Sequence, residues 1–483
     1  MNNLFFIFKK KFSTTPKYFL NKSKPIKNRN IQERIKDFKS ISENYSKSNI
    51  INQASRCLDC GTPWCHVKPH GCPLNNYIPE WNQLIKNNDW KKAYDMLTKT
   101  SNMSEITGLV CPAPCESSCT LELSTNDPVK IRNIEYAIVT NAWESGWIQP
   151  NVPKVRTNKK IAIIGSGPCG LSAADLLNQK GHNITVYEKD DKIGGLLMYG
   201  IPNMKLDKNI VNRRVNLLQD EGINFVINTD IGNNYDTKTL LDNYDAILLA
   251  IGSTVPRDIN IKGRNLNGIH FAMDILKNDT KKILDENYSD KFYTKNKKII
   301  IIGGGDTATD CLASAIRNNC SSLVCFNRSE KPPQIRSIEN PWPELQMIYK
   351  IDYGHEEAIH SFGKDPRKYQ ILVKEFIGNT DNNVKFVKTV NIDKNFKEIP
   401  NSEKYWDCDI IIISVGYIGT ETNLLNKLNI QQNEKNNVMS LFKYSTTNKK
   451  IFAAGDCRIG QSLVVNAIDE GRRVSNTIHK FLS

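Results

Sequence analysis

Apolar residues follow two different periods along the chain. In residues 78–100 (IPEWNQLIKNNDWKKAYDMLTKT) and 129–146 (VKIRNIEYAIVTNAWESG) they recur every three or four positions, which predicts amphipathic helices. Beyond residue 152, short apolar runs that predict strands are followed by segments with helical spacing. We therefore expect a small helical domain first and an α/β region after it.

Residues 159–190 (KKIAIIGSGPCGLSAADLLNQKGHNITVYEKD) contain an apolar strand, a glycine-rich turn, a helix and a second strand. This order is that of a dinucleotide-binding unit. Gly165 allows the tight turn, Gly167 lets a pyrophosphate approach the backbone, and Gly170 packs the helix against the strand. The helix N-terminus faces the phosphates. Glu188, 23 residues after Gly165, ends the second strand, where a carboxylate can hydrogen-bond an adenosine ribose.

A second unit of this kind occupies residues 297–330 (KKIIIIGGGDTATDCLASAIRNNCSSLVCFNRSE). Asn327 and Arg328 stand where the first unit has its acid. An arginine offers a charged, planar fork to phosphate, which favours the 2′-phosphate of NADP over NAD. Glu330 follows two residues later, and a shifted register would bring it to the ribose instead. The turn residues expected to contact this second nucleotide are Gly303, Gly305, Asp306, Thr307 and Ala308.

Two further segments are expected to contact the first nucleotide. In the last segment, Gly455 and Asp456 follow a strand, and a helix starts near Ser462. Asp456 can hydrogen-bond a ribityl hydroxyl of FAD, and the helix N-terminus can stabilise negative charge on the reduced flavin. The other segment, GGLLMYGIPNMKL (194–206), follows the first unit. It supplies the expected contacts Gly195 and Leu196. Lys205 in the same segment is expected to be a surface lysine, with a place near the flavin ring as the alternative.

Seven of the thirteen cysteines fall in one stretch of the chain. Their spacing is Cys57-x2-Cys60-x4-Cys65-x6-Cys72 and Cys111-x3-Cys115-x3-Cys119. Such short intervals present several thiolates to one centre, which is typical of metal sites. A flavin protein with no other electron exit needs a redox-active centre, which favours iron–sulfur clusters over zinc. Zinc bound by four of these cysteines, with His66 and His70 nearby, and a redox-silent cluster are the alternatives.

The other six cysteines are scattered, and burial as small apolar side chains is expected for all of them. We expect Cys169 and Cys311 at helix starts, Cys320 and Cys325 around the second strand of the second unit, and Cys408 and Cys457 on strands.

The formal net charge of +14 lies largely at the N-terminus, because residues 1–32 hold eight Lys and Arg and no acid. The basic charge is therefore not read as a nucleic-acid signal. Apolar residues alternate with Lys in this segment, which resembles a mitochondrial transit peptide, although a disordered basic tail is the alternative. We expect a mitochondrial location, with the cytoplasm as the alternative. No apolar run approaches the roughly 20 residues of a membrane span.

The order of FAD unit, inserted NADP unit and returning Gly-Asp strand resembles the glutathione and thioredoxin reductase superfamily. The chain lacks that superfamily's redox C-x-x-C pair in residues 194–206 and in the second unit, so its electrons need another exit. The phrases QASRCLDCGTPWCH, GCPLNNYIPEWN, EITGLVCPAPCESSCT, GGGDTATDC, ENPWPE and GDCRIGQSLVVNAIDEGRR together closely resemble the small-subunit family of NADPH-dependent glutamate synthase from about residue 50 onward. Dihydropyrimidine dehydrogenase and NADPH-ferredoxin oxidoreductase subunits share the cysteine block.

The resemblance implies a fold with two Rossmann-like domains after a small α-helical iron–sulfur domain. Apolar runs at 244–253 and 406–421 would be the crossings between the two Rossmann-like domains. The implied divisions are a basic leader (1–35), a cluster domain (36–152), an FAD domain (153–256 and 419–483) and an NADPH domain (257–418).

The resemblance also implies two [4Fe-4S] clusters. One would be held by Cys57, Cys60, Cys65 and Cys119, and the other by Cys72, Cys111, Cys115 and the non-cysteine ligand Glu135. The alternative for Glu135 is an ordinary solvated helix carboxylate.

The implied reaction passes a hydride from NADPH to FAD and single electrons through the clusters to a large subunit. That subunit, a glutamine amidotransferase and FMN chain, would make glutamate from glutamine and 2-oxoglutarate. No catalytic side chain is required for the half-reaction of this chain. The alternatives are a stand-alone NADPH:ferredoxin or other acceptor oxidoreductase and a non-catalytic scaffold with zinc in its cysteines.

Overall fold

The computed structural model describes residues 22–441 and 443–483, which form two compact units. The first, here the cysteine unit, contains Glu43–Ile148 and Arg336–Met347 together with residues 22–27. The second, here the dinucleotide unit, contains Asn28–Ser42, Gln149–Ile335 and Ile348–Ser483.

This division differs from the predicted one at both ends of the cluster domain, because residues 36–42 and 149–152 belong to the dinucleotide unit, and at two further segments. The segment Arg336–Met347, predicted within the NADPH domain, belongs to the cysteine unit, where the Trp342 ring packs edge-on against Trp64 at 5.6 Å. Of the predicted leader, residues 1–21 lie outside the described residues. Its last residues, 28–35, belong to the dinucleotide unit, where helix α3 (Ile31–Arg34) buries Arg34. Residues 28–35 are thus part of a folded unit, and the end of a leader stays a prediction.

The cysteine unit is helical, as the apolar spacing predicts. The predicted helical stretch 78–100 forms two helices, because the chain turns at Asn87–Asp89. Its helices are α4 (Lys47–Ala54), α5 (Ile78–Lys86), α6 (Trp90–Thr98), α7 (Ser104–Val110), α8 (Pro114–Ser117), α9 (Thr120–Thr125) and α10 (Ile131–Glu144).

Helix α10 is the centre of this unit and packs against α4, α6 and α7. Its residues Ile134 and Ile138 are fully buried. Gly108 allows the close approach of α7, because a Cβ there would lie 2.8 Å from the Cα of Tyr136. The loops between these helices carry six of the seven clustered cysteines, and the seventh, Cys115, lies on α8.

The dinucleotide unit contains two five-stranded parallel sheets. The order of the first is β15-β4-β1-β2-β3, so the strand nearest the C-terminus returns to the sheet of the first glycine turn, as predicted. Its strands are β1 (Lys160–Ile164), β2 (Asn183–Tyr187), β3 (Asn224–Val226), β4 (Ala246–Leu249) and β15 (Ile451–Ala453).

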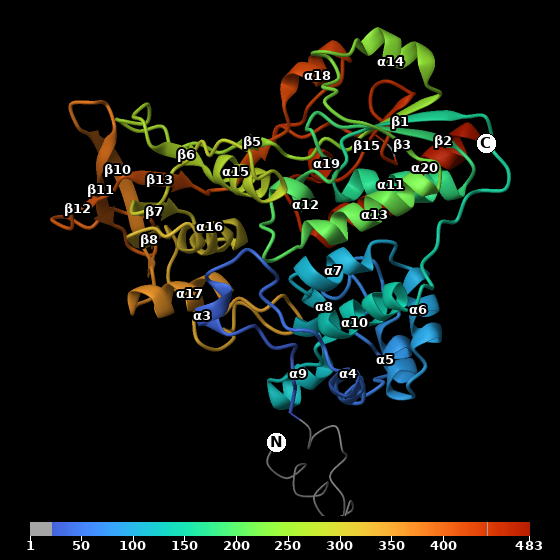
Figure 1. The fold of residues 1–483 in the computed structure, drawn as a ribbon, viewed down its shortest axis with the longest axis horizontal. Coiled ribbons are helices and arrows are strands. Elements are labelled where there is room, and N and C mark those ends of the chain that lie inside the picture. Colours follow the sequence, from blue (N-terminus) through green and yellow to red (C-terminus); the bar gives the residue numbers. More distant parts are fainter. Residues whose placement is uncertain (1–21, 442) are drawn as a thin grey trace, which may run out of the picture. The chain divides into compact units, whose positions relative to one another are not determined.

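Helices cover both faces of this first sheet (Figure 1). On one face, α14 and α18 contribute Leu240 and Leu425 to a core with alternate strand residues such as Ile247. On the other, α11 and α20 pack against each other, with α13 beside them. The helices are α11 (Pro168–Gln179), α12 (Leu196–Tyr199), α13 (Lys208–Asp220), α14 (Thr237–Asn243), α18 (Thr422–Lys427), α19 (Asp456–Ile459) and α20 (Val464–Leu482).

The second sheet has the order β6-β13-β7-β8-β9. Helices α15 (Ala272–Leu284), α16 (Asp306–Arg317) and α17 (Tyr353–Phe362) cover the face to which Ile299 and Ile301 point. Ile300 and Ile302 point instead to a three-stranded antiparallel sheet. The strands are β6 (Ile269–Phe271), β7 (Lys298–Ile302), β8 (Ser322–Phe326), β9 (Arg367–Lys368) and β13 (Ile410–Ile413), with β10 (Ile371–Gly378), β11 (Val384–Asn391) and β12 (Lys404–Asp407) in the smaller sheet.

Two short antiparallel strands, β5 (Val255–Pro256) and β14 (Tyr417–Gly419), connect the two sheets. They continue the apolar runs 244–253 and 406–421, which the sequence predicts to be crossings. Each five-stranded sheet is parallel with helices on at least one face, so the predicted α/β class with two Rossmann-like domains is confirmed.

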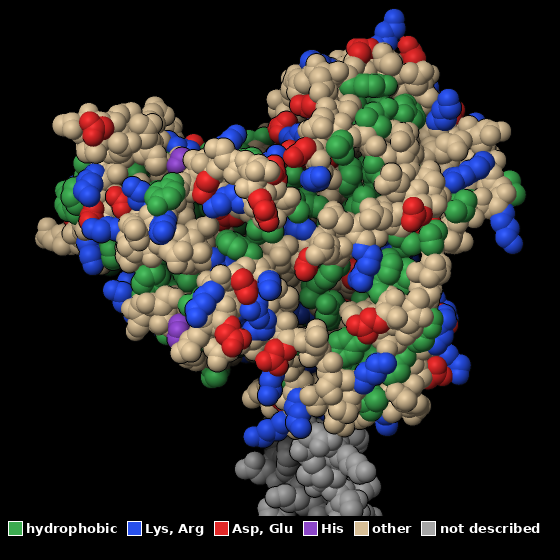
Figure 2. All heavy atoms as spheres, viewed as in Figure 1, with side chains coloured by type: hydrophobic (Ala, Val, Ile, Leu, Met, Phe, Trp, Pro, Cys, Tyr) green, Lys and Arg blue, Asp and Glu red, His purple; other side chains and the backbone are tan. Residues whose placement is uncertain are grey.

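The surface of the described residues mixes both signs of charge. On the face drawn in Figure 2, Lys and Arg side chains are interspersed with Asp and Glu. Within the described residues, no helix is both long enough and apolar enough to cross a membrane.

Candidate functional site

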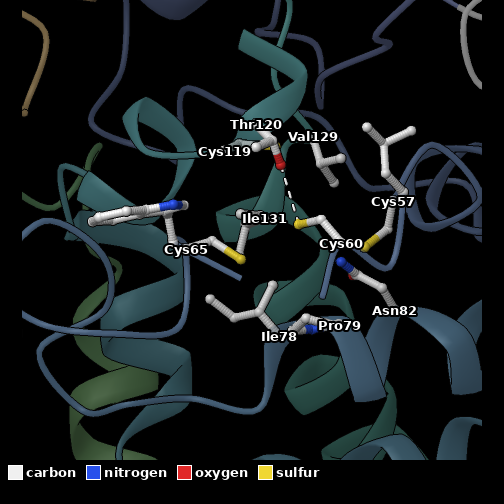
Figure 3. Close-up of a pocket in the computed structure, with 12 residues that line it drawn as sticks. Cys57, Cys60, Cys65, Ile78, Pro79, Asn82, Cys119, Thr120, Val129 and Ile131 are labelled. Carbon is white, nitrogen blue, oxygen red and sulfur yellow. Dashed lines mark hydrogen bonds between the residues drawn. The ribbon is translucent and has the colours of Figure 1, made fainter. Parts of the chain in front are cut away.

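Four cysteines surround one small cavity in the cysteine unit (Figure 3). They are the four that the sequence assigns to a first cluster, Cys57, Cys60, Cys65 and Cys119. The cavity measures about 20 Å³, and most of its wall is apolar. Cys119 comes from a position 54 residues beyond Cys65, at the N-cap of α9, so the fold brings distant parts of the chain together.

The chemistry of these thiols fits a metal cluster. Burial raises the pKa of Cys57, Cys65 and Cys119, because the apolar wall disfavours a thiolate and neighbouring thiolates would repel each other. Iron ions would neutralise the four negative charges that this wall opposes. Thr120 already donates a hydrogen bond from Oγ1 to Cys60 Sγ at 3.1 Å, so one sulfur has a donor in place.

The second predicted group is also assembled. Cys72, Cys111 and Cys115 are buried and interact electrostatically with one another. Glu135 acts on Cys111 and Cys115 from α10. Burial raises the pKa of Cys111 to about 12, which again makes a free thiolate unfavourable. The structure thus places the non-cysteine candidate beside the three cysteines that lack a fourth ligand.

Glu135 is not a solvated helix carboxylate, because only 6 % of it is exposed. Thr107 donates a hydrogen bond to Glu135 Oε1 at 2.6 Å, and burial raises the Glu135 pKa to about 7. That alternative is therefore wrong for Glu135, and its role as a ligand stays a prediction.

The two cysteine groups are joined through one backbone contact that sequence reasoning missed. The Cys72 amide donates to the Cys65 carbonyl at 2.8 Å. This approach needs Gly71, because a Cβ there would lie 2.1 Å from the Trp64 carbonyl oxygen. The glycine directly before Cys72 was the feature of the sequence that could have indicated this close backbone approach.

The histidines considered for zinc do not join either group. His66 Nδ1 lies 2.7 Å from the Asn76 carbonyl oxygen, and neither His66 nor His70 lines the cysteine cavity. Within the described residues, no three His, Cys, Asp or Glu side chains converge tightly enough to hold a single metal ion. A [4Fe-4S] cluster takes its four cysteines on separate iron atoms and so does not need that convergence.

The first glycine turn has the geometry that phosphate binding requires. Gly165 has φ +99°, and a Cβ there would lie 2.4 Å from the Ala250 carbonyl oxygen. A Cβ on Gly170 would lie 2.1 Å from the Gly165 carbonyl oxygen, whereas one on Gly167 would meet nothing within 4 Å. Gly167 is also the N-cap of α11 and offers no side-chain cap, so the first amides of the helix stay available to phosphate.

Glu188 sits directly behind this turn and is 5 % exposed. Its Oε2 accepts hydrogen bonds from Ser166 N at 3.1 Å and Ser166 Oγ at 2.5 Å. Ser166 Oγ in turn accepts from Gly194 N at 2.9 Å. Ser166 was missed in the sequence. It ties Glu188 to the start of the 194–206 segment, and contact of Glu188 with a ribose stays a prediction.

A cavity of about 1020 Å³ opens along the second glycine turn. It brings together residues predicted for both nucleotides: Leu196, Gly303, Gly305, Asp306, Thr307, Arg328 and Asp456. Asp456 Oδ1 accepts a hydrogen bond from Ser462 Oγ at 2.8 Å, and burial raises the Asp456 pKa to about 6. The other predicted residues do not line it: Gly165, Gly167, Gly170, Glu188, Gly195, Ala308 and Gly455. Ala308 is buried within α16, and Gly195 packs on the first turn, where its Cβ would lie 3.0 Å from Gly167 Cα.

Arg328 lines this cavity and stacks on an aromatic ring. Its guanidinium carbon lies 4.9 Å from the ring centroid of Phe396. No carboxylate among the described residues forms an ion pair with Arg328, so its donors remain available to an anion. Glu330, the residue that a shifted register would use, does not line the cavity. Phe396 was missed because it lies 68 residues further on, in the turn between β11 and β12.

Lys205 is not a surface lysine, and that prediction is wrong. Its Nζ lies 3.0 Å from Asp310 Oδ1, and only 19 % of the side chain is exposed. Tyr353 Oη donates to the same Asp310 oxygen at 2.6 Å. The contact joins the 194–206 segment to helix α16, across 105 residues of sequence.

The six scattered cysteines are all buried, as predicted. Two of them do not lie on strands as expected. Cys408 lies between β12 and β13, and Cys457 lies on α19, where its thiol donates to the Leu249 carbonyl at 3.2 Å.

Two families match this chain. Residues 34–147 match the dihydropyrimidine dehydrogenase domain II family, described as carrying a 4Fe-4S cluster. Residues 159–471 match the pyridine nucleotide-disulphide oxidoreductase family. Among solved structures, FprA of Mycobacterium tuberculosis in complex with NADPH is similar with a TM-score of 0.55 and 16 % identity, covering 67 % of this chain and 84 % of that one. This last likeness concerns the fold alone.

Glutamate synthase chains match nearly the whole sequence. The glutamate synthase [NADPH] small chain of Bacillus subtilis is 45 % identical, over 93 % of this chain and 94 % of the relative. The glutamate synthase [NADH] of Saccharomyces cerevisiae is 44 % identical, over 96 % of this chain and 22 % of the relative. The chain thus spans about a fifth of the length of that yeast protein. It belongs to the glutamate synthase small-chain family and is an iron–sulfur flavoprotein oxidoreductase.

Proposed function

We propose that this chain is the NADPH-oxidising, electron-input subunit of a glutamate synthase. The observation that carries the proposal is the match to a small chain over 94 % of that relative's length, through both the cysteine unit and the dinucleotide unit. A protein of this design takes electrons at one unit and releases them at the other.

Different residues of the chain would bind the different cofactors. The glycine turns at Gly165 and Gly303 would hold the two pyrophosphates at helix N-termini, and the two cysteine groups would hold the clusters. When bound, FAD exchanges two electrons with a nicotinamide and one with a cluster, so it joins the two kinds of carrier. The protein positions these groups and excludes water, and the half-reaction needs no side-chain acid or base.

The choice of NADPH rests on Arg328. The names of relatives do not decide it, because the chain is 45 % identical to an enzyme named for NADPH and 44 % identical to one named for NADH. Arg328 lines the cavity with no acidic partner among the described residues, and Phe396 holds its guanidinium from one side. A fixed arginine without a carboxylate beside it suits a 2′-phosphate, whereas the 2′- and 3′-hydroxyls of NAD are typically bound by a carboxylate that accepts from them.

The proposed partner is a large glutamine amidotransferase and FMN chain. Purified protein should show flavin absorption with a broad iron–sulfur shoulder. Adding glutamine and 2-oxoglutarate should speed NADPH oxidation only when a large synthase chain is present, with glutamate as the product. If ferredoxin alone accepts the electrons at the same rate and no large chain stimulates oxidation, the protein is a stand-alone oxidoreductase instead.

We also propose a mitochondrial location, on the strength of the acid-free basic segment. Most of that segment, residues 1–21, lies outside the described residues. Cell fractionation of the chain with a C-terminal tag, followed by N-terminal sequencing of the mature protein, tests this. Full-length protein in the cytosol would overturn it.

A further inference from the structure

One buried amide side chain in the wall of the first cysteine cavity lacks a well-formed hydrogen bond. Asn82, on α5, is 1 % exposed, and neither its Nδ2 nor its Oδ1 has a partner at hydrogen-bond geometry among the described residues, although the amide lies close enough to Cys57 to stabilise charge on that sulfur. Leaving a buried amide unpaired costs about 1–3 kcal/mol, so a group that supplies the missing bond would be stabilised there. The cavity itself is where such a group would lie.

The position of the Asn82 amide indicates which kind of group would bind to it. Figure 3 shows the amide end of Asn82 directed toward the sulfurs of Cys57 and Cys60. The other lining residues near it are apolar, among them Ile78, Pro79, Val129 and Ile131. The Thr120 hydroxyl, another polar group in the wall, already donates to Cys60 Sγ, and the indole N–H of Trp64 is a donor and cannot accept from Asn82. The acceptors within reach of Asn82 are therefore sulfur atoms.

We propose that Asn82 donates an N–H hydrogen bond to a sulfur of the first [4Fe-4S] cluster and so makes that cluster easier to reduce. The proposal rests on assigning this cluster to Cys57, Cys60, Cys65 and Cys119. An amide can present either N–H or C=O, and the negative charge of a thiolate-bound cluster selects the N–H side. Hydrogen bonds to cluster sulfurs raise the potential, because they favour the state with the extra electron. Asn82 thus tunes the potential of the cluster and itself transfers neither an electron nor a proton.

The test compares reduction potentials in the holoprotein. Asn82→Leu keeps the volume and removes the donor. A charge-assisted hydrogen bond of this kind contributes about tenfold to the equilibrium constant for adding one electron, so the potential should fall by about 59 mV. Anaerobic redox titration followed by electron paramagnetic resonance measures this potential. The resonance signal that is lost in the Cys60→Ala variant identifies the first cluster. The flavin potential should stay unchanged.

Two further variants serve as positive and negative controls for the measured cluster potential. Thr120→Val removes a donor that the structure already shows, and should lower the same potential. Gln53→Leu is the matched control. Gln53 is 1 % exposed, has no partner for either amide atom among the described residues, and does not line the cavity. Its removal should leave both cluster potentials unchanged.

An Asn82→Leu potential equal to that of the unaltered chain, with Thr120→Val shifted, would overturn the proposal. If the Asn82→Leu protein does not assemble the cluster, the hydrogen bond is tested in the unaltered holoprotein instead. Asparagine labelled with nitrogen-15 in its side-chain amide should then show a hyperfine coupling to the reduced cluster, and absence of this coupling also overturns the proposal. If Cys60→Ala retains all its iron, the cluster assignment itself fails, which is a separate result.

Discussion

Arg34 and Glu357 form a buried ion pair across 323 residues of sequence, with Arg34 Nε donating to Glu357 Oε1 at 2.8 Å. The side chains are 1 % and 0 % exposed. The pair anchors segment Asn28–Ser42, which also contacts the 194–206 segment of the dinucleotide unit. There the Ile41 amide donates to the Met204 carbonyl at 2.9 Å. The segment thus links helix α17 of the second sheet to the flavin-side segment 194–206.

Removing Arg34 should destabilise this unit. Arg34→Met leaves Glu357 with Arg317 as its remaining partner, so we expect a loss of about 3 kcal/mol, at the lower end for a broken buried pair. The measurement is urea unfolding of the dinucleotide unit followed by flavin fluorescence. Arg29→Met is the control, because the Arg29–Asp37 pair in the same segment is 24 % and 30 % exposed and should contribute less than about 1 kcal/mol. Equal losses in the two variants would contradict the anchoring role.

The same segment limits where a leader can be removed. Deleting residues 1–21 should leave flavin content, iron content and stability unchanged. Deleting residues 1–42 should lower the stability and flavin retention of the dinucleotide unit, because it removes the Arg34 ion pair and the Met204 contact together. Thermal release of flavin from the two truncated proteins measures the difference. Identical release temperatures would show that the segment contributes nothing.

Arg328 should distinguish the two nicotinamide nucleotides. Arg328→Ala removes the cation that would face the 2′-phosphate, and a hydrogen bond to a charged group contributes about 1.5–3 kcal/mol. We therefore expect KM for NADPH to rise by about 10- to 100-fold, with KM for NADH nearly unchanged. Steady-state oxidation of each nucleotide with an artificial acceptor checks this without the partner chain. An equal rise for both nucleotides would remove the basis for the NADPH assignment.

The sequence predicts what is local and misses what packing decides. Glycine spacing and apolar runs predict both dinucleotide units, because a turn such as Gly165 and its flanking strand and helix are neighbours in the chain. The resemblance to a family was needed to place Cys119 with Cys57. Lys205 was misread as a surface residue, since its partner Asp310 lies on a helix of the other sheet domain and no pattern near Lys205 indicates it. No pattern in the sequence singles out Asn82 either, because the cysteines that it faces, Cys57 and Cys60, lie more than 20 residues earlier.

Phe396 should affect the same nucleotide preference more weakly. It is 52 % exposed and adopts φ +61°, in a turn that Asp393 closes by accepting from the amides of Asn395 and Lys397. An exposed cation–π contact contributes about 0.5–1 kcal/mol, so Phe396→Ala should raise KM for NADPH by about two- to fivefold. Phe396→Trp should restore the value, and inhibition by 2′-phospho-AMP should weaken in parallel in the Ala variant. A change in KM for NADH of the same size would mean that Phe396 shapes the cavity in general.

Glu135 should be required for one cluster and not for the other. Glu135→Leu removes both carboxylate oxygens and keeps an apolar side chain in the buried site, so the three cysteines Cys72, Cys111 and Cys115 lose their candidate fourth ligand. We expect iron and acid-labile sulfide to fall by the share of one cluster, while the signal that depends on Cys60 persists.

The control for this loss is Glu122→Leu. Glu122 is 7 % exposed, accepts a hydrogen bond from Gln346 and belongs to neither cysteine group, so its removal should leave the iron content unchanged. Full iron content and two cluster signals in Glu135→Leu would show that another group, such as a solvent molecule, completes the second cluster. Loss of both signals would show instead that Glu135, on the central helix α10, supports the fold around both cysteine groups. The Cys60-dependent signal therefore distinguishes the two roles, because it persists if Glu135 is only a ligand of the second cluster.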